Sequence, residues 1–268
     1  MHLDPRNIFS VSIVSHGHRN FVLSLLDDLA RTKRLDFEVI LTWNLKDEVT
    51  EIDAASYPFT VISIINSLPQ GFAHNHNAAF RKSNGANFVV LNPDIRLPED
   101  PFGALLEVVS SRPGTICAPI ILNTAYERED SARFFPTPWL LLKKTSAKVC
   151  GILLPLQDVP CHGRLLNPDW IAGMFMVIPR QIYIALDGLS ERYFLYYEDV
   201  DFCARARLQH FDILVTKDAI AIHDARRESH RNVRFLAWHI TSAIRFFTSR
   251  AYLWLRLRML FKTRSIKP

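Results

Sequence analysis

Residues 8–44 read IFSVSIVSHGHRNFVLSLLDDLARTKRLDFEVILTWN, and this stretch decides the fold class. Ile8–Ser15 is a short apolar segment typical of a buried strand, and His16-Gly17-His18 ends it. Phe21–Arg31 then places apolar residues at helical spacing, and Phe37–Thr42 is a second apolar strand. A strand, a helix and another strand in this order predict a βαβ unit with parallel strands.

The same alternation continues along the chain. Further strands are predicted at Phe59–Ile65, Asn87–Leu91, Thr115–Leu122, Asp169–Pro179 and Asp212–Thr216. Helices are predicted at Gly71–Phe80, Pro101–Ser111, Trp139–Lys148, Gln181–Leu186, Asp199–Gln209 and from Val233 onward. The sequence therefore predicts an α/β fold, in which residues 1–232 form a mostly parallel sheet flanked by helices and residues 233–268 form a C-terminal amphipathic helical extension.

Basic residues concentrate at the C-terminal end. From residue 226 onward there are eleven Lys and Arg residues and a single acid, Glu228, so this segment carries a net charge of +10 while the rest of the chain carries −5. Aromatic and aliphatic residues separate the arginines. Helices of this composition suit the headgroup region of an anionic membrane surface. The alternative is an amphipathic helix that packs on the body of the protein.

Cysteine usage and the N-terminus suggest a compartment. The four cysteines contain no Cys-x-x-Cys pair, so we expect reduced, mostly buried thiols of a cytosolic protein. The N-terminal residues lack the pattern of a signal peptide, and no apolar run approaches the ~20 residues that span a bilayer. We expect a cytoplasmic protein that is peripheral to a membrane.

Polar residues follow several of the predicted strands. In parallel sheets, ligands lie beyond the carboxyl ends of the strands, so Ser15–His18, Trp43-Asn44 and Asn92–Asp94 should line one crevice. An acid placed as Asp94 is can hold a divalent cation beside a bound diphosphate. Taken alone, the same residues also fit a common Asx turn or helix cap.

A second acidic cluster, Glu198-Asp199-Val200-Asp201, follows the aromatic run Phe194–Tyr197. A carboxylate at the start of a helix is kept ionised by the positive helix end and can act as general base. Asp201 and Arg205 are four residues apart and can pair along that helix. The alternative is a solvated acidic first turn, which the aromatic run before it disfavours.

His223 is a candidate metal ligand, because a neutral imidazole binds divalent metals. A lone histidine is more often a satisfied polar residue. His16-x-His18 and His74-x-His76 lack the cysteines of a structural zinc site, which argues against zinc.

Seven short motifs occur along the chain, and their combination and order are more informative about the protein's family than any single motif. They are VSIVSHGH (residues 11–18), GFAHNHNA (71–78), LNPD (91–94), RFFPTP (133–138), DWIAGMFMVIPR (169–180), FLYYEDVDFCAR (194–205) and IH (222–223). The set resembles family 2 glycosyltransferases of the GT-A fold, with most similarity to bacterial O-antigen rhamnosyltransferases that use dTDP-L-rhamnose. The resemblance covers nearly the whole chain.

The resemblance implies a role for each matching residue. Asp199 matches the catalytic base, with Glu198 as its rival, and Asp94 with His223 would hold Mg²⁺ or Mn²⁺. The donor-binding residues would be Ser15, His16, Asn44, Asn75, Asn77, Asn92, Asp94, Trp170, Ala172 and Gly173. The acceptor-binding residues would be Arg133, Asp201 and Arg205. One position departs from the family, because Trp43 stands where members often carry an acid that recognises the nucleotide base.

The resemblance thus implies an inverting glycosyltransferase that moves a sugar, expected to be L-rhamnose from dTDP-L-rhamnose, to a polyprenyl-diphosphate-linked saccharide acceptor. This chemistry belongs to O-antigen and lipopolysaccharide biosynthesis at the cytoplasmic face of the bacterial inner membrane. The alternatives are a hexosyl- or galactofuranosyltransferase that uses a UDP-sugar, and a non-catalytic relative that binds sugar nucleotides. A nucleic-acid-binding protein is disfavoured, because the body is acidic and carries no nucleic-acid motif.

Overall fold

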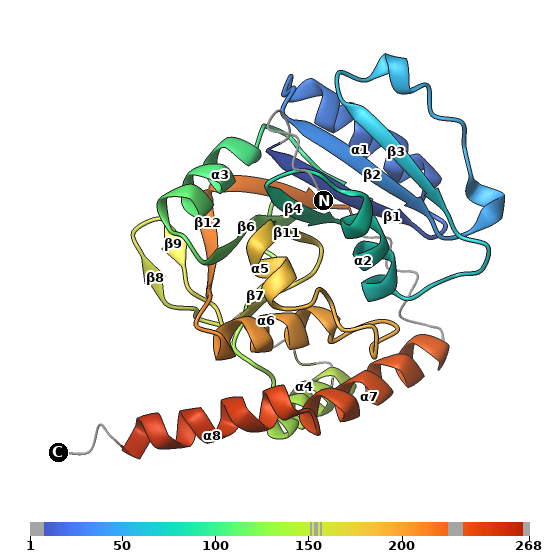
Figure 1. Cartoon of the computed structure of the whole chain (residues 1–268). Coiled ribbons are helices and arrows are strands. Elements are labelled where there is room, and N and C mark those ends of the chain that lie inside the picture. Colours follow the sequence, from blue (N-terminus) through green and yellow to red (C-terminus); the bar gives the residue numbers. More distant parts are fainter. Residues whose placement is uncertain (1–7, 151, 153–154, 156, 225–232, 265–268) are drawn as a thin grey trace.

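The computed structural model describes residues 8–150, 152, 155, 157–224 and 233–264. Within these ranges one large mixed sheet lies between two layers of helices (Figure 1). Its strands are β1 (Phe9–Ser15), β2 (Phe37–Trp43), β3 (Thr60–Ile65), β4 (Asn87–Leu91), β5 (Ile95–Arg96), β6 (Thr115–Asn123), β8 (Cys161–His162), β9 (Leu165–Leu166), β11 (Phe175–Pro179) and β12 (Asp212–His223). Two further strands, β7 (Ala132–Arg133) and β10 (Trp170–Ile171), pair with each other.

The helices of the described residues fall close to their predicted ranges. They are α1 (Arg19–Arg31), α2 (Phe72–Lys82), α3 (Phe102–Ser111), α4 (Pro138–Val149), α5 (Arg180–Ala185), α6 (Glu198–Leu208), α7 (Val233–Phe247) and α8 (Arg250–Arg264), with short 3-10 turns η1 (Lys46–Glu48) and η2 (Ala54–Ser56). The α/β fold class predicted from the alternation of strands and helices is confirmed.

The strands follow the order β3-β2-β1-β4-β11-β6-β12-β9-β8. Neighbouring strands from β3 to β4 are parallel, as predicted, whereas β11 runs antiparallel to both β4 and β6. The predicted strand Asp169–Pro179 is divided into β10 and β11 by a turn at Ala172–Met174. This turn allows β10 to leave the main sheet and pair with β7.

The strand β12 is longer than the predicted Asp212–Thr216. Its register against β6 shifts between Thr216 and Ile220 and then continues to His223. The pairing with β6 therefore resumes after the polar residues Lys217 and Asp218. The last two residues of β12, Ile222 and His223, also pair with β5. His223 is therefore the last residue of β12, whereas the predicted strand ended at Thr216 and left His223 outside the sheet.

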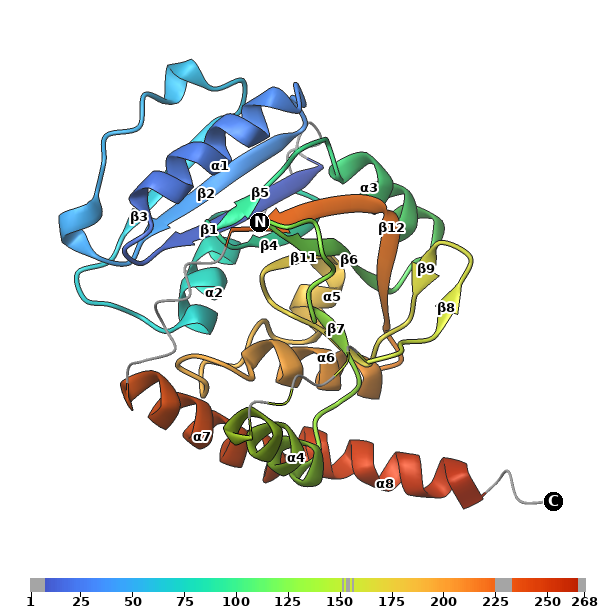
Figure 2. The same ribbon diagram turned by 180° about the vertical axis from the view of Figure 1, so that it is seen from behind.

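Apolar side chains fill both faces of the sheet. One core lies under α1 and α3 and includes Phe9, Leu25 and Phe102. The other lies under α2, α5 and α6 and includes Phe88, Tyr183 and Phe202 (Figures 1 and 2). Two covered faces explain why strands such as β2 and β4 are buried at every position.

The predicted C-terminal helix is two helices, α7 and α8, separated at Thr248-Ser249. Phe246 is 0% exposed and Tyr252 is 8% exposed, and both belong to the core under α6. Ser242 Oγ donates a hydrogen bond of 2.9 Å to the carbonyl of Leu195. The helical extension is therefore attached to the body along one face of α7 and part of α8.

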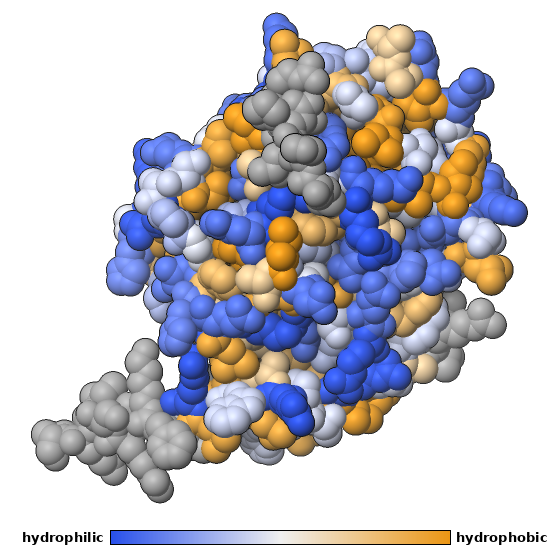
Figure 3. Space-filling model, viewed as in Figure 1, coloured by the Kyte–Doolittle hydropathy of each residue, from blue (hydrophilic) through white to orange (hydrophobic). Residues whose placement is uncertain are grey.

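The outer faces of the C-terminal helices carry apolar side chains. Leu236, Ile240 and Ile244 recur every four residues on α7 and are 60%, 50% and 59% exposed. Trp254 on α8 is 60% exposed. Figure 3 shows apolar surface along the lower edge of the molecule, where α7 and α8 lie, interrupted by hydrophilic residues. In the described ranges, none of the helices has both the length and the apolar character that crossing a bilayer demands.

The four cysteines are free thiols, as expected from their spacing. Cys117 and Cys203 are buried, but Cys150 and Cys161 are exposed, so only half of them match the expected burial.

Candidate active site

Asp94 and His223 are brought together by the pairing of β5 with β12. His223 lies opposite Ile95 in this antiparallel pair, and the amide of Asp224 donates to the carbonyl of Asp94 at 2.8 Å. The side chains consequently meet, with His223 Nε2 3.3 Å from Asp94 Oδ2. The structure therefore places the two predicted metal ligands side by side, although they are 129 positions apart in the sequence.

His223 has a second acidic partner that sequence reasoning missed. Its Nδ1 lies 2.8 Å from Glu129 Oε2. Burial lowers the pKa of His223, but Asp94 and Glu129 outweigh it and raise this pKa to about 9. The other oxygen of Asp94, Oδ1, is buried without a hydrogen-bond partner in the described part of the chain.

That bare oxygen fits a bound cation, because buried polar atoms are otherwise almost always paired. Among the described residues, no group of three or more His, Cys, Asp or Glu side chains is arranged as a complete metal site. Any cation here would need oxygen ligands from a bound molecule in addition to Asp94 and His223. This is the situation typical of Mg²⁺ beside phosphates.

The predicted base lies at the first turn of α6. Tyr196 and Tyr197 immediately before it both have left-handed backbone angles, with φ of 69° and 67°. Such angles cost free energy for non-glycine residues and often mark functional sites. The rings of Tyr196 and Tyr197 lie 5.3 and 5.4 Å from that of His239 on α7, which helps to hold this turn.

Glu198 and Asp199 differ in their surroundings. Burial raises the pKa of the Glu198 carboxyl well above its ordinary value, Asp199 raises it further, and its Oε2 has no partner among the described residues. Burial also raises the pKa of Asp199, but the amides of Gly173 and Val200 and the charge of Arg133 oppose this. Asp199 is therefore the member of the pair that ionises more readily.

The turn Ala172–Met174 connects the two acidic regions. The amide of Gly173 donates to Asp199 Oδ2 at 3.0 Å. One residue further, the carbonyl of Met174 accepts from the amide of Asn92 at 2.8 Å. A Cβ on Gly173 would lie 3.4 Å from both the Asp199 Cβ and the Phe72 ring, so a glycine permits this close approach. The loops that carry Asp94 and Asp199 thus meet at one turn.

A cavity of about 260 Å³ opens beside Asp199. It is lined by residues of the Arg133 loop, α4, Trp170, the start of α6 and His239 of α7. The guanidinium of Arg133 lies 5.1 Å above the Trp170 ring, and the indole Nε1 of Trp170 donates to the carbonyl of Phe134 at 3.0 Å. Arg133 and Trp170 are therefore placed near Asp199, as their predicted roles require.

A polar network lies at the carboxyl ends of β1, β2 and β3. Asn44 Nδ2 donates to His16 Nδ1 and to the Gln70 carbonyl, both at 3.0 Å. Asn66 Nδ2 donates to Asn44 Oδ1 at 2.8 Å and to Asn75 Oδ1 at 2.7 Å. The predicted residues His16, Asn44 and Asn75 are thus neighbours, joined by Asn66, which no motif had indicated.

Ser15 and Trp43 take structural positions at the same end of the sheet. Ser15 is fully buried and donates to Glu48 Oε2 at 2.6 Å, and Glu48 also accepts from the amides of Gly17 and His18. Trp43 is 1% exposed in the core that contains α1. The Trp43 ring therefore belongs to the core, and Glu48, which follows β2, holds the turn after β1.

Asn77 differs from its predicted donor contact. Its Oδ1 accepts from Tyr183 Oη at 2.7 Å and from the amide of Leu189 at 3.0 Å. Its Nδ2 donates to the carbonyl of Leu189 and to Glu191 Oε1. The amide anchors the loop after α5, and this engagement leaves it no free group for a nucleotide.

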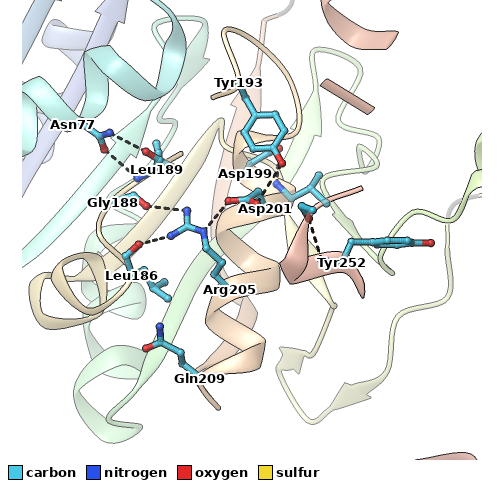
Figure 4. A network of polar contacts seen from close by, with 12 residues as sticks. Asn77, Leu186, Gly188, Leu189, Tyr193, Asp199, Asp201, Arg205, Gln209 and Tyr252 are labelled. Atoms are coloured by element: carbon cyan, nitrogen blue, oxygen red, sulfur yellow. Dashed lines mark hydrogen bonds and ion pairs between the residues drawn. The ribbon is translucent and has the colours of Figure 1, made fainter. Parts of the chain in front are cut away.

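Asp201 and Arg205 pair as predicted (Figure 4), but they line a different cavity from Asp199. Arg205 Nε donates to Asp201 Oδ2 at 2.7 Å, and its other nitrogens donate to the carbonyls of Leu186 and Gly188. Tyr193 Oη donates to Asp201 Oδ1 at 3.3 Å. These bonds fasten the loop after α5 to α6, which differs from the predicted acceptor role.

A larger open cavity of about 1040 Å³ lies on that side of α6. It is lined by Asp201, Arg205 and residues of α2, α5 and α8, and neither Asp94, Asp199 nor His223 contributes to it. The larger cavity is therefore not the one beside the candidate catalytic residues. We assign the candidate active site to the smaller cavity and to the Asp94–His223 pair, which the turn Ala172–Met174 connects to Asp199.

Solved structures with the same architecture define the fold as GT-A. GalNAc-T7 with UDP, GalNAc and Mn²⁺ superposes with a TM-score of 0.67 at 15% identity, over 92% of this chain and 49% of that one. The mannosyltransferase PcManGT from Pyrobaculum calidifontis with GDP-Man and Mn²⁺ superposes with a TM-score of 0.59 at 13% identity, over 89% and 64% of the two chains. The chain spans about half the length of the GalNAc-T7 structure.

The chain is a glycosyltransferase with the GT-A fold. It is 26% identical over 258 residues to the rhamnosyltransferase WbbL of Escherichia coli K12, covering 91% of this chain and 94% of WbbL. It is 27% identical over 177 residues to the N-acetylglucosaminyl-diphospho-decaprenol L-rhamnosyltransferase of Mycobacterium tuberculosis, covering 63% and 57%. The low-salt glycan biosynthesis hexosyltransferase Agl10 of Haloferax volcanii is 29% identical over 159 residues, covering 58% and 48%. No family model matches the chain.

Proposed function

We propose that this glycosyltransferase transfers L-rhamnose from dTDP-L-rhamnose, with inversion, to a saccharide carried on polyprenyl diphosphate in bacterial cell-surface polysaccharide synthesis. The observation that carries the proposal is the turn Ala172–Met174, which contacts both the Asp94 loop and Asp199. A cation-and-diphosphate region and a general base next to each other are what a single displacement at an anomeric carbon needs. Rhamnose is favoured by the similarity to two rhamnosyltransferases.

The donor nucleotide would lie against the network of His16, Asn44 and Asn75 at the strand ends, and its diphosphate near Asn92 and Asp94. Asp94 and His223 would hold Mg²⁺ or Mn²⁺, which supplies positive charge for the leaving diphosphate. A divalent cation is supported by the bare Oδ1 of Asp94 and by the Mn²⁺ in two structures of the same fold.

Asp199 would deprotonate the acceptor hydroxyl. Its two oxygens are oriented by the amides of Gly173 and Val200, which fixes the direction from which it can take a proton. Burial raises the pKa of Glu198 beside it and so favours the protonated form of that carboxyl. Arg133 and Trp170 would border the acceptor and the donor sugar, and Arg133 keeps a positive charge near the reacting atoms.

The acceptor would reach this site from an anionic membrane surface. The cavity beside Asp199 lies between α4 and α7, since Leu140, Leu141 and His239 all line it. Next to it, Trp139 and Leu142 on α4 are 75% and 57% exposed, and α7 exposes its apolar stripe. The arginines of α7 and α8 add the charge that attracts anionic lipids. This arrangement supports a peripheral position on the cytoplasmic face of the inner membrane.

A second candidate is transfer of a hexose from a UDP-sugar. The similarity to the hexosyltransferase Agl10 favours it. The buried Trp43 stands where family members often carry the acid that recognises the base, so this position does not select one base over another.

The direct test is transfer by the purified full chain to a synthetic polyprenyl-diphosphate saccharide, with dTDP-L-rhamnose and UDP-hexoses compared side by side with Mg²⁺ or Mn²⁺. We expect product only with dTDP-L-rhamnose, and loss of product after EDTA. Faster transfer from a UDP-hexose would replace rhamnose with that sugar. Binding of the donor without any transfer would favour the non-catalytic alternative.

A further inference from the structure

Glu129 has no role in the mechanism above, although it approaches His223 more closely than Asp94 does. The distance from His223 Nδ1 to Glu129 Oε2 is 2.8 Å, against 3.3 Å from Nε2 to Asp94 Oδ2. The two carboxylates therefore lie on opposite sides of one imidazole ring, and each faces a different nitrogen.

The backbone fixes both partners of this contact. The amide of Glu129 donates to the carbonyl of Ile121, and its carbonyl accepts from the amide of Ser131, both at 2.9 Å. Asn123 stands opposite His223 in the pairing of β6 with β12, and its Oδ1 accepts from the amides of the hairpin turn that leads to Glu129. The hairpin thus returns Glu129 to the end of β12.

We propose that Glu129 is a positioning residue for the divalent cation: in the cation-bound protein it accepts a hydrogen bond from His223 Nδ1 and so directs the Nε2 lone pair toward the cation beside Asp94. This inference rests on the proposed function, because it assumes that Asp94 and His223 bind the cation. A neutral imidazole offers one nitrogen to a metal only if the other keeps the proton. Carboxylates that hold this second nitrogen fix the ring and typically change metal affinity 10- to 100-fold.

A purely structural role makes a different prediction. If Glu129 only fastened its hairpin to β12, its substitution would lower thermal stability and leave cation affinity unchanged. The two roles are therefore separated by measuring cation binding directly, independently of sugar transfer.

The experiment is Mn²⁺ binding to the full chain with saturating dTDP, followed by electron paramagnetic resonance of free Mn²⁺. Glu129→Gln keeps the length of the side chain and one oxygen acceptor but removes the charge. We expect the Mn²⁺ dissociation constant to rise about 10- to 100-fold. Glu127→Gln is the matched control on the same hairpin, since Glu127 is exposed and bonds to Asn123, and it should bind as the wild type does.

A double substitution shows whether Glu129 acts through His223. In a His223→Ala background, Glu129→Gln should weaken Mn²⁺ binding no further, because the ring that it positions is gone. Equal Mn²⁺ affinity of Glu129→Gln and the wild type would overturn the proposal and leave the proposed transferase intact. Absence of Mn²⁺ binding by the wild type would overturn both this proposal and the cation role of Asp94. Sugar transfer measured in the presence of EDTA would then show whether the protein is still a transferase.

Discussion

At the scale of single residues, the site depends on two adjacent carboxyls with different surroundings. Asp199 accepts hydrogen bonds from two backbone amides and is stabilised by the positive charge of Arg133. Glu198 is buried, and its Oε2 has no hydrogen-bond partner in the described part of the chain. Two interacting acids so placed divide their roles, because the better solvated or better bonded one ionises first.

Asp199→Asn should abolish base catalysis and keep the shape of the site. Removal of a general base typically costs about 10²- to 10⁴-fold in rate, so we expect kcat to fall by that amount while the dissociation constant of the donor stays within about twofold. Timed transfer assays measure kcat, and isothermal titration calorimetry measures the dissociation constant of the donor. Wild-type turnover in this variant would exclude Asp199 as the base.

Glu198→Gln should keep transfer and change the pH dependence of stability. Because the folded-state pKa of Glu198 is raised, the wild type holds a proton that the unfolded chain releases, and stability falls as pH rises from the ordinary value toward the raised one. Glutamine mimics the protonated form at every pH, so the Tm advantage of the variant should grow from pH 4 to pH 8. A Tm difference between the variant and the wild type that stays constant from pH 4 to pH 8 would contradict the raised pKa of Glu198.

The sequence could indicate Asp94 and Asp199, because each stands after a predicted strand or at a predicted helix start within a motif, and it could indicate His223 through its place in the ordered set of motifs. It could not indicate Glu129 or Asn66, since a carboxyl in a hairpin and an amide in a loop carry no local pattern. Nor could it separate Asn75 from Asn77, which lie two residues apart on α2 and point to different partners.

At the scale of elements, the periodicity of apolar residues predicted most helices and strands to within a few residues. It did not predict the short strands β5, β7, β8 and β9, because two paired residues leave no periodic signal. It also joined α7 to α8, since Thr248-Ser249 interrupts the helix without a glycine or proline. The burial of Phe246 shows that this helical extension is part of the folded body.

Two residues on α7 test this attachment as a matched pair. Phe246 is fully buried against Tyr197 and Tyr252, whereas Ile244, two residues earlier, is 59% exposed. Phe246→Ala should lower the free energy of unfolding by about 3–5 kcal/mol, the usual range for a buried phenylalanine. Ile244→Ala should change it by less than about 0.5 kcal/mol, as is usual for exposed positions. Urea unfolding followed by circular dichroism compares them, and equal small effects would mean that α7 contributes nothing to stability.

At the scale of the whole molecule, charge and apolar surface lie at the same end. The acidic body contains the polar network at the strand ends, where we propose that the donor lies. The basic C-terminal segment contains α7, whose His239 lines the cavity beside Asp199. Neither feature alone indicates a membrane, because many amphipathic helices are simply packed on a core. The exposed stripe on α7 together with Trp139 on α4 is the part that the sequence could not separate from core-facing positions.

Binding to vesicles should therefore depend on this surface and on salt. Ile240→Ser with Ile244→Ser removes two side chains that are 50% and 59% exposed, and we expect at least about tenfold weaker partition onto anionic liposomes. The control pair is Leu35→Ser with Ile184→Ser, which are 73% and 60% exposed outside α4 and α7 and should bind as the wild type does. In 1 M salt, where the screening length is about 3 Å, the attraction of the arginines should be lost and flotation of the wild type should fall. Equal flotation of both pairs would show that this face does not meet the membrane, and the acceptor would then have to reach Asp199 by another side.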